Sequence, residues 1–331
     1  MVDLVTVPGA PAAPAAAALR RLPGLRPQAY EHPQDRQALD ALQRTRGLDT
    51  LVRKCNEWGF ERLLRVQLTG SSLRVTADAF PQLQELFADV CATLDLPRVP
   101  ELYVGAGGEI EALTAGVDHP IVVLSSGAVD QLDDAELRFL LAREVGHVKS
   151  GHVLYYQIAE FLPLISEAIG DATFGVGALL GAGLQLALLN WRRKSEHTAD
   201  RAGLLAVQDQ QVALTVLMKL SGLPQRLRDA VNVDDFVAQA RAFDALDSDK
   251  LSWFAKWLGA SGRSHPWTVL RAKECVAWVE AGGYERVLAA PAEVPLQLPP
   301  GVARFCVHCG AGLGAAAAYC THCGQPVATT R

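Results

Sequence analysis

Four cysteines near the end of the chain have the spacing of a metal site. Cys306 and Cys309 form one Cys-x-x-Cys pair, Cys320 and Cys323 form a second pair, and each pair is followed by a glycine. Four thiolates complete a tetrahedral Zn²⁺ site without an open position, and the glycines permit the tight turns that the pairs need. A redox Cys-x-x-Cys would need a βαβ context that this tail lacks. We therefore predict a structural zinc ion.

These two pairs resemble a bacterial zinc ribbon. Such a module is too small to hold a core without its metal, and the resemblance implies that it docks a protein partner. We predict the ribbon over residues 304–326, after a Pro/Leu-rich linker over residues 286–303. His308 and His322 lie inside the pairs, and we expect them to be exposed rather than to bind the metal.

A second set of residues that suits metal chemistry lies on a predicted helix. The segment Asp133–Glu136 predicts a capping box, and the helix that follows carries Arg143, Glu144 and His147. The four-residue spacing puts positions 143 and 147 on one helical face. Taken alone, this group is typical of a charged helix surface. His152 is off that face, so we expect it at the helix end or at the surface.

This helix resembles the active-site helix of the gluzincin metallopeptidases, specifically of the CAAX prenyl endopeptidase and heat-shock membrane protease family. Two more of the family's motifs follow in order, a Glu-x-x-x-Asp at Glu196 and Asp200 and a His-Pro at His265. The resemblance covers about residues 35–285. It implies a mainly α (α+β) fold, a helical metallopeptidase domain with a small β-sheet, which we predict over residues 31–285.

The resemblance also implies roles for individual residues. Glu144 corresponds to the general base, and His147 and Glu196 correspond to zinc ligands. Asp200 corresponds to a carboxylate behind the ligands that orients a ligand imidazole. His265 corresponds to a donor to the tetrahedral oxyanion.

The first metal ligand of the family's His-Glu-x-x-His motif is replaced in this sequence. Arg143 stands at that position, and a guanidinium has no lone pair with which to bind zinc. His147 and Glu196 alone fall short of the three protein ligands of a catalytic zinc site. An alternative is that His152 or His197 supplies the missing ligand.

A second departure lies where the family usually has an Asn-Ala pair in the substrate cleft. Glu111 precedes Ala112 here, and its carboxylate opposes the negative charge that develops on a polarised carbonyl oxygen. We predict that the Arg143 guanidinium takes the place of the metal. It would form a bidentate pair with Glu196 and also meet Glu111.

These features favour a catalytically impaired metallopeptidase homologue that binds peptides or unfolded protein segments and docks a partner through its ribbon. We expect zinc in the ribbon and regard a catalytic zinc ion as doubtful. One alternative is an active zinc endopeptidase in protein quality control, with Glu144 as general base. Another is an otherwise active enzyme in which Arg143 is an isolated substitution.

Composition limits the other classes of function. Half of the 331 residues are hydrophobic, which suits about two domains with a sizeable core. The chain has 36 acidic and 31 basic residues, so it lacks the basic field that general nucleic-acid binding needs. Its seven cysteines suit a reducing compartment, and its N-terminus lacks a signal-peptide pattern. We expect a cytoplasmic protein, with association at the cytoplasmic face of a membrane as an alternative.

The apolar pattern predicts the elements around these residues. We expect an Ala/Pro-rich arm over residues 1–30, and then a helical region from about residue 35. Two short strands around a turn are predicted over residues 63–69 and 73–76, a helix over 80–94, and strands over 101–104 and 121–124. The glycines at 105–108 lack the third position of a dinucleotide fingerprint, so they predict a turn.

Residues 172–191 carry no charge and are numerous enough to cross a bilayer. The apolar stretch before them contains Glu160 and Glu167, each of which costs about 2.5–3.5 kcal/mol at a bilayer centre. His147 and Glu196 must also end on the same side to share a cleft. We therefore expect a helical hairpin that is buried or lies along a membrane surface, rather than a single span. The alternative is a pair of spans, of which the first would contain Glu160 and Glu167.

Overall fold

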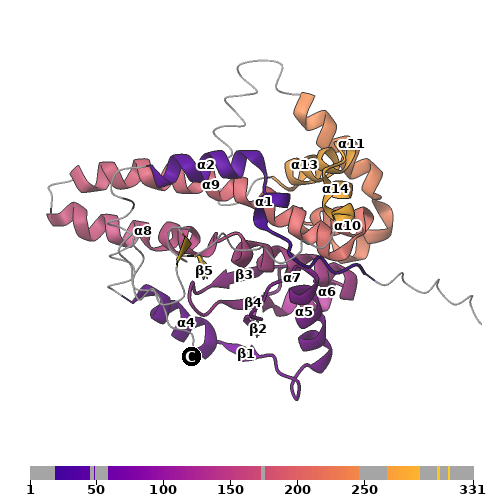
Figure 1. Cartoon of the computed structure of the whole chain (residues 1–331), viewed down its shortest axis with the longest axis horizontal. Coiled ribbons are helices and arrows are strands. Elements are labelled where there is room, and N and C mark those ends of the chain that lie inside the picture. The colour runs from indigo at the N-terminus through magenta and orange to yellow at the C-terminus, as the bar shows by residue number, and fades with distance from the viewer. Residues whose placement is uncertain are drawn as a thin grey trace, which may run out of the picture. The chain divides into compact units, whose positions relative to one another are not determined.

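The computed structural model describes residues 19–44, 48, 59–172, 176–245, 267–290, 304–305 and 312–313. The chain divides into two compact units, Met1–Ala290 and Pro291–Arg331. The first unit is mainly α with a small sheet, as the sequence predicts (Figure 1). Its elements are α1 (Pro27–Tyr30), α2 (Pro33–Gln43), α4 (Phe60–Gly70), β1 (Ser72–Arg74), α5 (Pro81–Thr93), β2 (Glu101–Gly105), β3 (Ala112–Ala115), β4 (Ile121–Ser125), α6 (Ser126–Gln131), α7 (Asp134–Lys149), α8 (Val153–Ala172), α9 (Val176–Val207), α10 (Gln210–Leu220), the 3-10 helix η1 (Gln225–Ala230), α11 (Val233–Ala245), α13 (Thr268–Glu280) and α14 (Gly283–Ala289).

The four-stranded sheet has the order β1-β2-β4-β3, so β3 lies at one edge. β2 and β4 are parallel, while β1 and β3 pair antiparallel with them. Every residue of β4 is buried, because alternate side chains enter different hydrophobic clusters on the two faces of the sheet. Leu102, Val122 and Leu124 face α5 and α7, whereas Tyr103, Ile121 and Val123 face α4. The predicted strands at 101–104 and 121–124 are confirmed.

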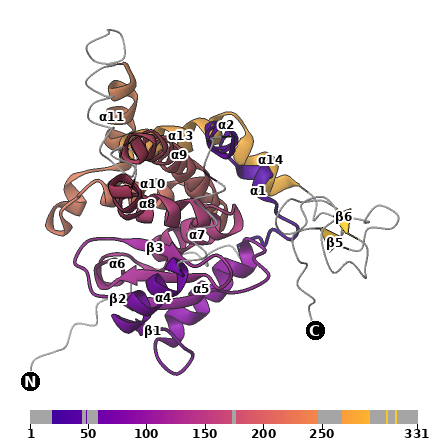
Figure 2. The same cartoon turned by 90° about the vertical axis from the view of Figure 1, so that its left-hand side faces the viewer.

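Helix α7 lies between the sheet and α9 (Figure 2). Its N-terminus has the predicted capping box, in which Asp133 accepts from the Glu136 backbone and Glu136 accepts from the Asp133 backbone. Glycines permit a close approach of α7 and α9. A Cβ at Gly146 would lie 2.6 Å from Cβ of Ala202, a contact that real Cβ atoms essentially never show. This packing brings the polar residues of the two helices together.

Residues 60–70 form a helix, so the predicted strand at 63–69 is wrong. Leu64 and Leu68, four residues apart, pack on the sheet face that contains Tyr103 and Ile121. The apolar run therefore follows the 3.6-residue period of a helix rather than the alternation of a strand. β1 at Ser72–Arg74 and α5 at Pro81–Thr93 match the other two predictions for this region, whereas β3 was not predicted.

The charge-poor segment forms part of a pair of long helices. α8 and α9 pack against each other, as the expected hairpin requires, and α2 lies beside α9 (Figure 1). Leu188 and Trp191 of α9 are fully buried in a cluster with Ile158 of α8 and Leu42 of α2. Among the described residues, no helix is both long and apolar enough to span a bilayer.

Residues from 19 onward pack into the core of the first unit, of which they are part. Leu22, Leu25 and Tyr30 are buried in the main core, and the backbone N–H of Leu22 donates to the carbonyl oxygen of Thr93. The arm predicted over residues 1–30 thus differs from the structure from residue 19 onward. At the other end of this unit, α14 continues to Ala289, beyond the predicted start of the linker at residue 286.

In the second unit, Arg304–Phe305 (β5) and Gly312–Leu313 (β6) pair antiparallel. The four predicted zinc ligands, Cys306, Cys309, Cys320 and Cys323, lie outside the described residues. The zinc ribbon therefore stays a prediction.

Candidate functional site

Helix α7 places three polar side chains inside the protein. Arg143, Glu144 and His147 are only 6%, 4% and 5% exposed. They are buried because one side of α7 faces the sheet and another faces α9, which contributes Glu196 and Asp200. The structure thus brings together five of the residues that the sequence singled out.

The Arg143 guanidinium joins the two carboxylates of α9. Its Nη2 donates to Oε2 of Glu196, and its Nε donates to Oδ1 of Asp200 at 2.9 Å. The predicted pairing with Glu196 is present, but it uses one nitrogen instead of two. The second carboxylate is Asp200 rather than Glu111, whose side chain is exposed just before β3. The expected contact between Arg143 and Glu111 is therefore wrong.

A second arginine, which the sequence analysis missed, completes this cluster. Arg271 of α13 donates from Nε to Oδ2 of Asp200 at 2.8 Å and from Nη2 to Oδ1 at 2.6 Å. Burial by itself raises the pKa of Asp200, but Arg271 and Arg143 together hold that pKa below its usual range. Asp200 is consequently an ionised partner of two arginines, and the four side chains balance in formal charge.

His147 is positioned by a chain of buried polar groups. Its Nε2 lies 3.7 Å from Oε1 of Glu196, and its Nδ1 lies 3.0 Å from Nδ1 of His152. His152 is fully buried in the turn between α7 and α8, with its Nε2 3.1 Å from Oδ2 of Asp35. His152 thus lies just past the end of α7, which is one of the two positions expected for it. The other expectation, a surface position, is wrong, because the polypeptide turns back there and α2 covers the side chain.

Asp35 is the last member of this series of buried polar contacts. No motif in the sequence indicated that it belongs to the site. Trp191 Nε1 donates to Oδ1 of Asp35 at 3.0 Å, and the Thr198 hydroxyl donates to Oδ2 at 2.5 Å. Asp35 lies in the first turn of α2 and both of these donors lie on α9. The carboxylate therefore ties the N-terminal helix to the helix that carries Glu196.

Tyr156 of α8 is a further residue of the site, and no motif in the sequence indicated it. Its hydroxyl donates to Oε1 of Glu196 at 2.7 Å and lies 3.0 Å from the Ser195 hydroxyl. Its ring centroid lies 5.0 Å from that of His147. Both carboxylate oxygens of Glu196 thus accept hydrogen bonds, one from Tyr156 and one from Arg143.

Glu144 is directed toward the sheet and away from this chain of contacts. The hydroxyl of Thr114 on β3 donates to Oε2 of Glu144 at 2.7 Å. Burial raises the pKa of Glu144, although Arg143 and the Thr114 hydrogen bond oppose the shift. This contact connects the edge strand β3 directly to α7.

These residues do not fit a catalytic zinc ion. Arg143 offers no lone pair, and its guanidinium occupies one oxygen of Glu196. Within the ranges that the structure describes, no three His, Cys, Asp or Glu side chains form a group that could hold a metal. His197, considered as a replacement ligand, packs its ring 5.1 Å from that of His32. His265, the predicted oxyanion donor, lies outside the described residues.

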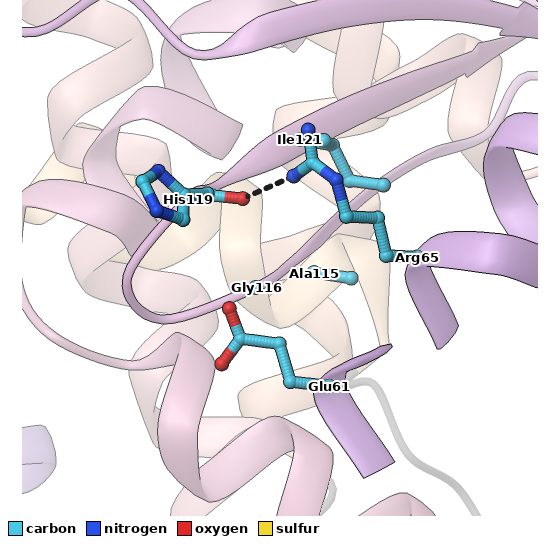
Figure 3. Close-up of a pocket in the computed structure, with 6 residues that line it drawn as sticks. All are labelled: Glu61, Arg65, Ala115, Gly116, His119 and Ile121. Carbon is cyan, nitrogen blue, oxygen red and sulfur yellow. Dashed lines mark hydrogen bonds between the residues drawn. The ribbon is translucent and has the colours of Figure 1, made fainter. Parts of the chain in front are cut away.

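A small pocket lies at the C-terminal end of β3 (Figure 3). Glu61 and Arg65 of α4 line it from one side, and His119 lines it from the turn before β4. Arg65 donates from Nη1 to the His119 carbonyl oxygen at 3.0 Å and from Nη2 to Glu101 at 2.8 Å. None of the residues that line this pocket belongs to the Arg143 cluster, so the two features are separate.

The fold and this arrangement of α7, α9 and an edge strand define a metallopeptidase-like domain. Residues 77–279 match peptidase family M48, which is more than half of the chain. The chain belongs to peptidase family M48.

Curated relatives agree with this assignment. The chain is 31% identical over 261 residues to the plastoglobule-localized metallopeptidase 48 of Arabidopsis thaliana. This alignment covers 78% of this chain and 74% of the relative. It is 26% identical over 192 residues to a protease HtpX homolog of Tropheryma whipplei, which covers 51% of this chain and 65% of the relative. It is 26% identical over 181 residues to protease HtpX homolog 2 of Methanosarcina mazei, which covers 48% of this chain and 61% of the relative. These two HtpX relatives are matched over less than two thirds of their lengths.

Proposed function

We propose that this chain is a catalytically impaired member of family M48 that binds peptides or unfolded protein segments. Within the family we place it beside the heat-shock membrane proteases and CAAX prenyl endopeptidases that its motifs resemble. The observation that carries the proposal is the pairing of Arg143 with Glu196 and Asp200. A buried guanidinium supplies the positive charge that these carboxylates need, but it does not bind or ionise water as a metal ion does.

The edge strand supports the binding half of the proposal. Among the described strands, β3 pairs only with β4, so its other edge remains unpaired. An extended peptide can add to such an edge through main-chain hydrogen bonds. Since Thr114 of β3 contacts Glu144, a peptide on β3 would lie next to the α7 site.

The remaining parts of the proposal concern partners and location. We infer that the four tail cysteines hold a structural zinc ion and that the resulting ribbon docks a protein partner. We place the chain in the cytoplasm, with peripheral contact to the cytoplasmic face of a membrane as a second location. The acidic balance of the sequence supports a partner other than nucleic acid.

A cleavage assay on unfolded casein, with and without a zinc chelator, tests the impairment. We expect no chelator-sensitive cleavage by the wild-type chain. Cleavage that a chelator abolishes, and that Glu144→Gln also abolishes, would contradict the proposal and support the alternative of a working zinc endopeptidase with Glu144 as general base. Cleavage that persists in Glu144→Gln would indicate a contaminating protease.

A further inference from the structure

The buried Arg143 side chain has donor capacity that the protein leaves unused. Its Nε binds Asp200 and its Nη2 binds Glu196, whereas Nη1 has no acceptor among the described residues. Nη1 also keeps some contact with solvent, unlike the fully buried polar atoms that lack a partner. The guanidinium is held rigidly by two carboxylates and still has a free donor edge.

The charges around this edge do not strongly oppose an incoming anion. Arg143 and Arg271 balance Glu196 and Asp200. Arg192 adds a third guanidinium, whose central carbon lies 4.5 Å from the centroid of the Tyr156 ring. Glu144 adds a third carboxylate, but burial raises its pKa and so favours its neutral form. The nearest described carboxylate to Arg192 is that of Glu160, at 4.0 Å and largely exposed to solvent.

The position of Arg143 relative to the sheet indicates what kind of anion arrives. The next residue, Glu144, accepts a hydrogen bond from Thr114 on the edge strand β3. A peptide that extends this edge would lie beside Glu144, one residue along α7 from Arg143. The group of a peptide main chain that matches a guanidinium is its terminal carboxylate. A guanidinium presents parallel N–H groups that suit the two oxygens of a carboxylate.

We propose that Arg143 receives the C-terminal carboxylate of a peptide held along β3, so that the former metal position is a carboxylate receptor. This inference rests on the proposed function, because it names the chemical class of the bound peptide. It predicts selection of peptides by a free C-terminus, whatever their side chains.

The test compares two probes that differ only at the C-terminus. Randomised decapeptides labelled with fluorescein at the N-terminus are prepared with either a free carboxylate or a primary amide, and their binding to the full-length chain is measured by fluorescence anisotropy. We expect the free acid to bind at least about tenfold more tightly, as a charge-assisted contact supplies. Excess acetate, a carboxylate without a peptide, should compete only weakly, because it makes no contact with β3.

Variants connect the preference to Arg143. Arg143→Gln should reduce the ratio of the two affinities to about one, whereas Arg143→Lys should keep part of it. Arg138→Gln on the same helix is the matched control, because it removes an equal charge from a pair with Asp89 and should keep the full ratio. If Arg143→Gln fails to fold, the wild-type chain and Arg143→Lys still decide the question.

Each outcome is informative. Equal binding of the acid and the amide by the wild-type chain overturns the carboxylate receptor and leaves peptide binding intact. Failure of both probes to bind overturns the proposed function, and the inference with it. Competition by acetate as effective as that by the peptide shows a site for small carboxylates rather than for a peptide terminus, and also overturns the inference.

Discussion

Nη2 of Arg143 on α7 donates a hydrogen bond to Oε2 of Glu196 on α9, a residue 53 positions further along the chain. Both side chains are nearly completely buried, so each needs the other's charge. Together with Asp200, these two side chains form a buried arginine–carboxylate cluster. Its consequences for stability, metal binding and pH dependence can be measured.

Replacing Arg143 by alanine should destabilise the fold strongly. The change leaves the buried carboxylates of Glu196 and Asp200 short of positive charge, which costs about 3–5 kcal/mol for a broken buried pair. The free energy of unfolding from urea titrations measures the loss. Arg138→Ala, which removes a partner of the partly exposed Asp89, should cost no more than about 1 kcal/mol. Similar losses in the two variants would show that the Arg143 cluster contributes no more than a surface pair.

Replacing Arg143 by histidine should create a metal site. A histidine at this position lies four residues before His147 and, with Glu196, completes three ligands. Metal analysis is best made in a chain whose cysteines 306, 309, 320 and 323 are serine, so that the predicted ribbon zinc does not contribute. In that background we expect about one zinc ion per chain with Arg143→His and about none with Arg143. Zinc bound equally without the histidine would contradict our interpretation of the site.

The Asp35 carboxylate should stabilise the fold in a pH-dependent way. Burial raises the pKa of Asp35, but His152, Thr198 and Trp191 together hold that pKa below its ordinary value. Its contribution is therefore complete above the unfolded pKa of about 3.9 and is lost as the pH falls through the lower folded value. Asp35→Asn should cost about 2–3 kcal/mol at neutral pH, because one amide oxygen replaces a charged acceptor of several donors.

The measurement is the difference in unfolding free energy between wild type and Asp35→Asn as a function of pH. We expect this difference to shrink below about pH 4. Asp40→Asn on the same helix is the control, because Asp40 is only partly buried and its replacement should cost little. A difference for Asp35→Asn that is unchanged at acid pH would show that the charge of Asp35 is not responsible.

Gly116 should not tolerate a side chain. It has a φ of +90°, and a Cβ there would lie 2.5 Å from the carbonyl oxygen of His119, beside the pocket at the end of β3. Gly116→Ala should cost more than about 1 kcal/mol, from the strained backbone and the close contact. Gly70→Ala at the end of α4 is a matched control with open space around it, and should be neutral or slightly stabilising. Thermal unfolding of both variants gives the comparison, and equal melting temperatures would contradict the predicted strain.

Local rules were sufficient for several elements. The capping box at Asp133 and Glu136 fixes the start of α7, and the apolar stripe of residues 81–93 specifies α5, because both signals act within a few residues. The run at 63–69 misled because a short apolar segment suits either a strand or a helix until a partner surface selects one. That surface is the sheet face with Tyr103 and Ile121, which only the folded chain provides.

The sequence by itself determined that position 143 cannot bind zinc, since this follows from the chemistry of arginine alone. The tertiary structure decided which groups pair with Arg143. Asp200 rather than Glu111 is the second partner of Arg143, and Arg271, Tyr156 and Asp35 complete the buried network. These contacts join residues far apart in the chain, and they depend on which faces α2, α7, α8, α9 and α13 present to one another. The residues of a motif on one helix do not specify those faces, because packing around a shared core determines which faces meet.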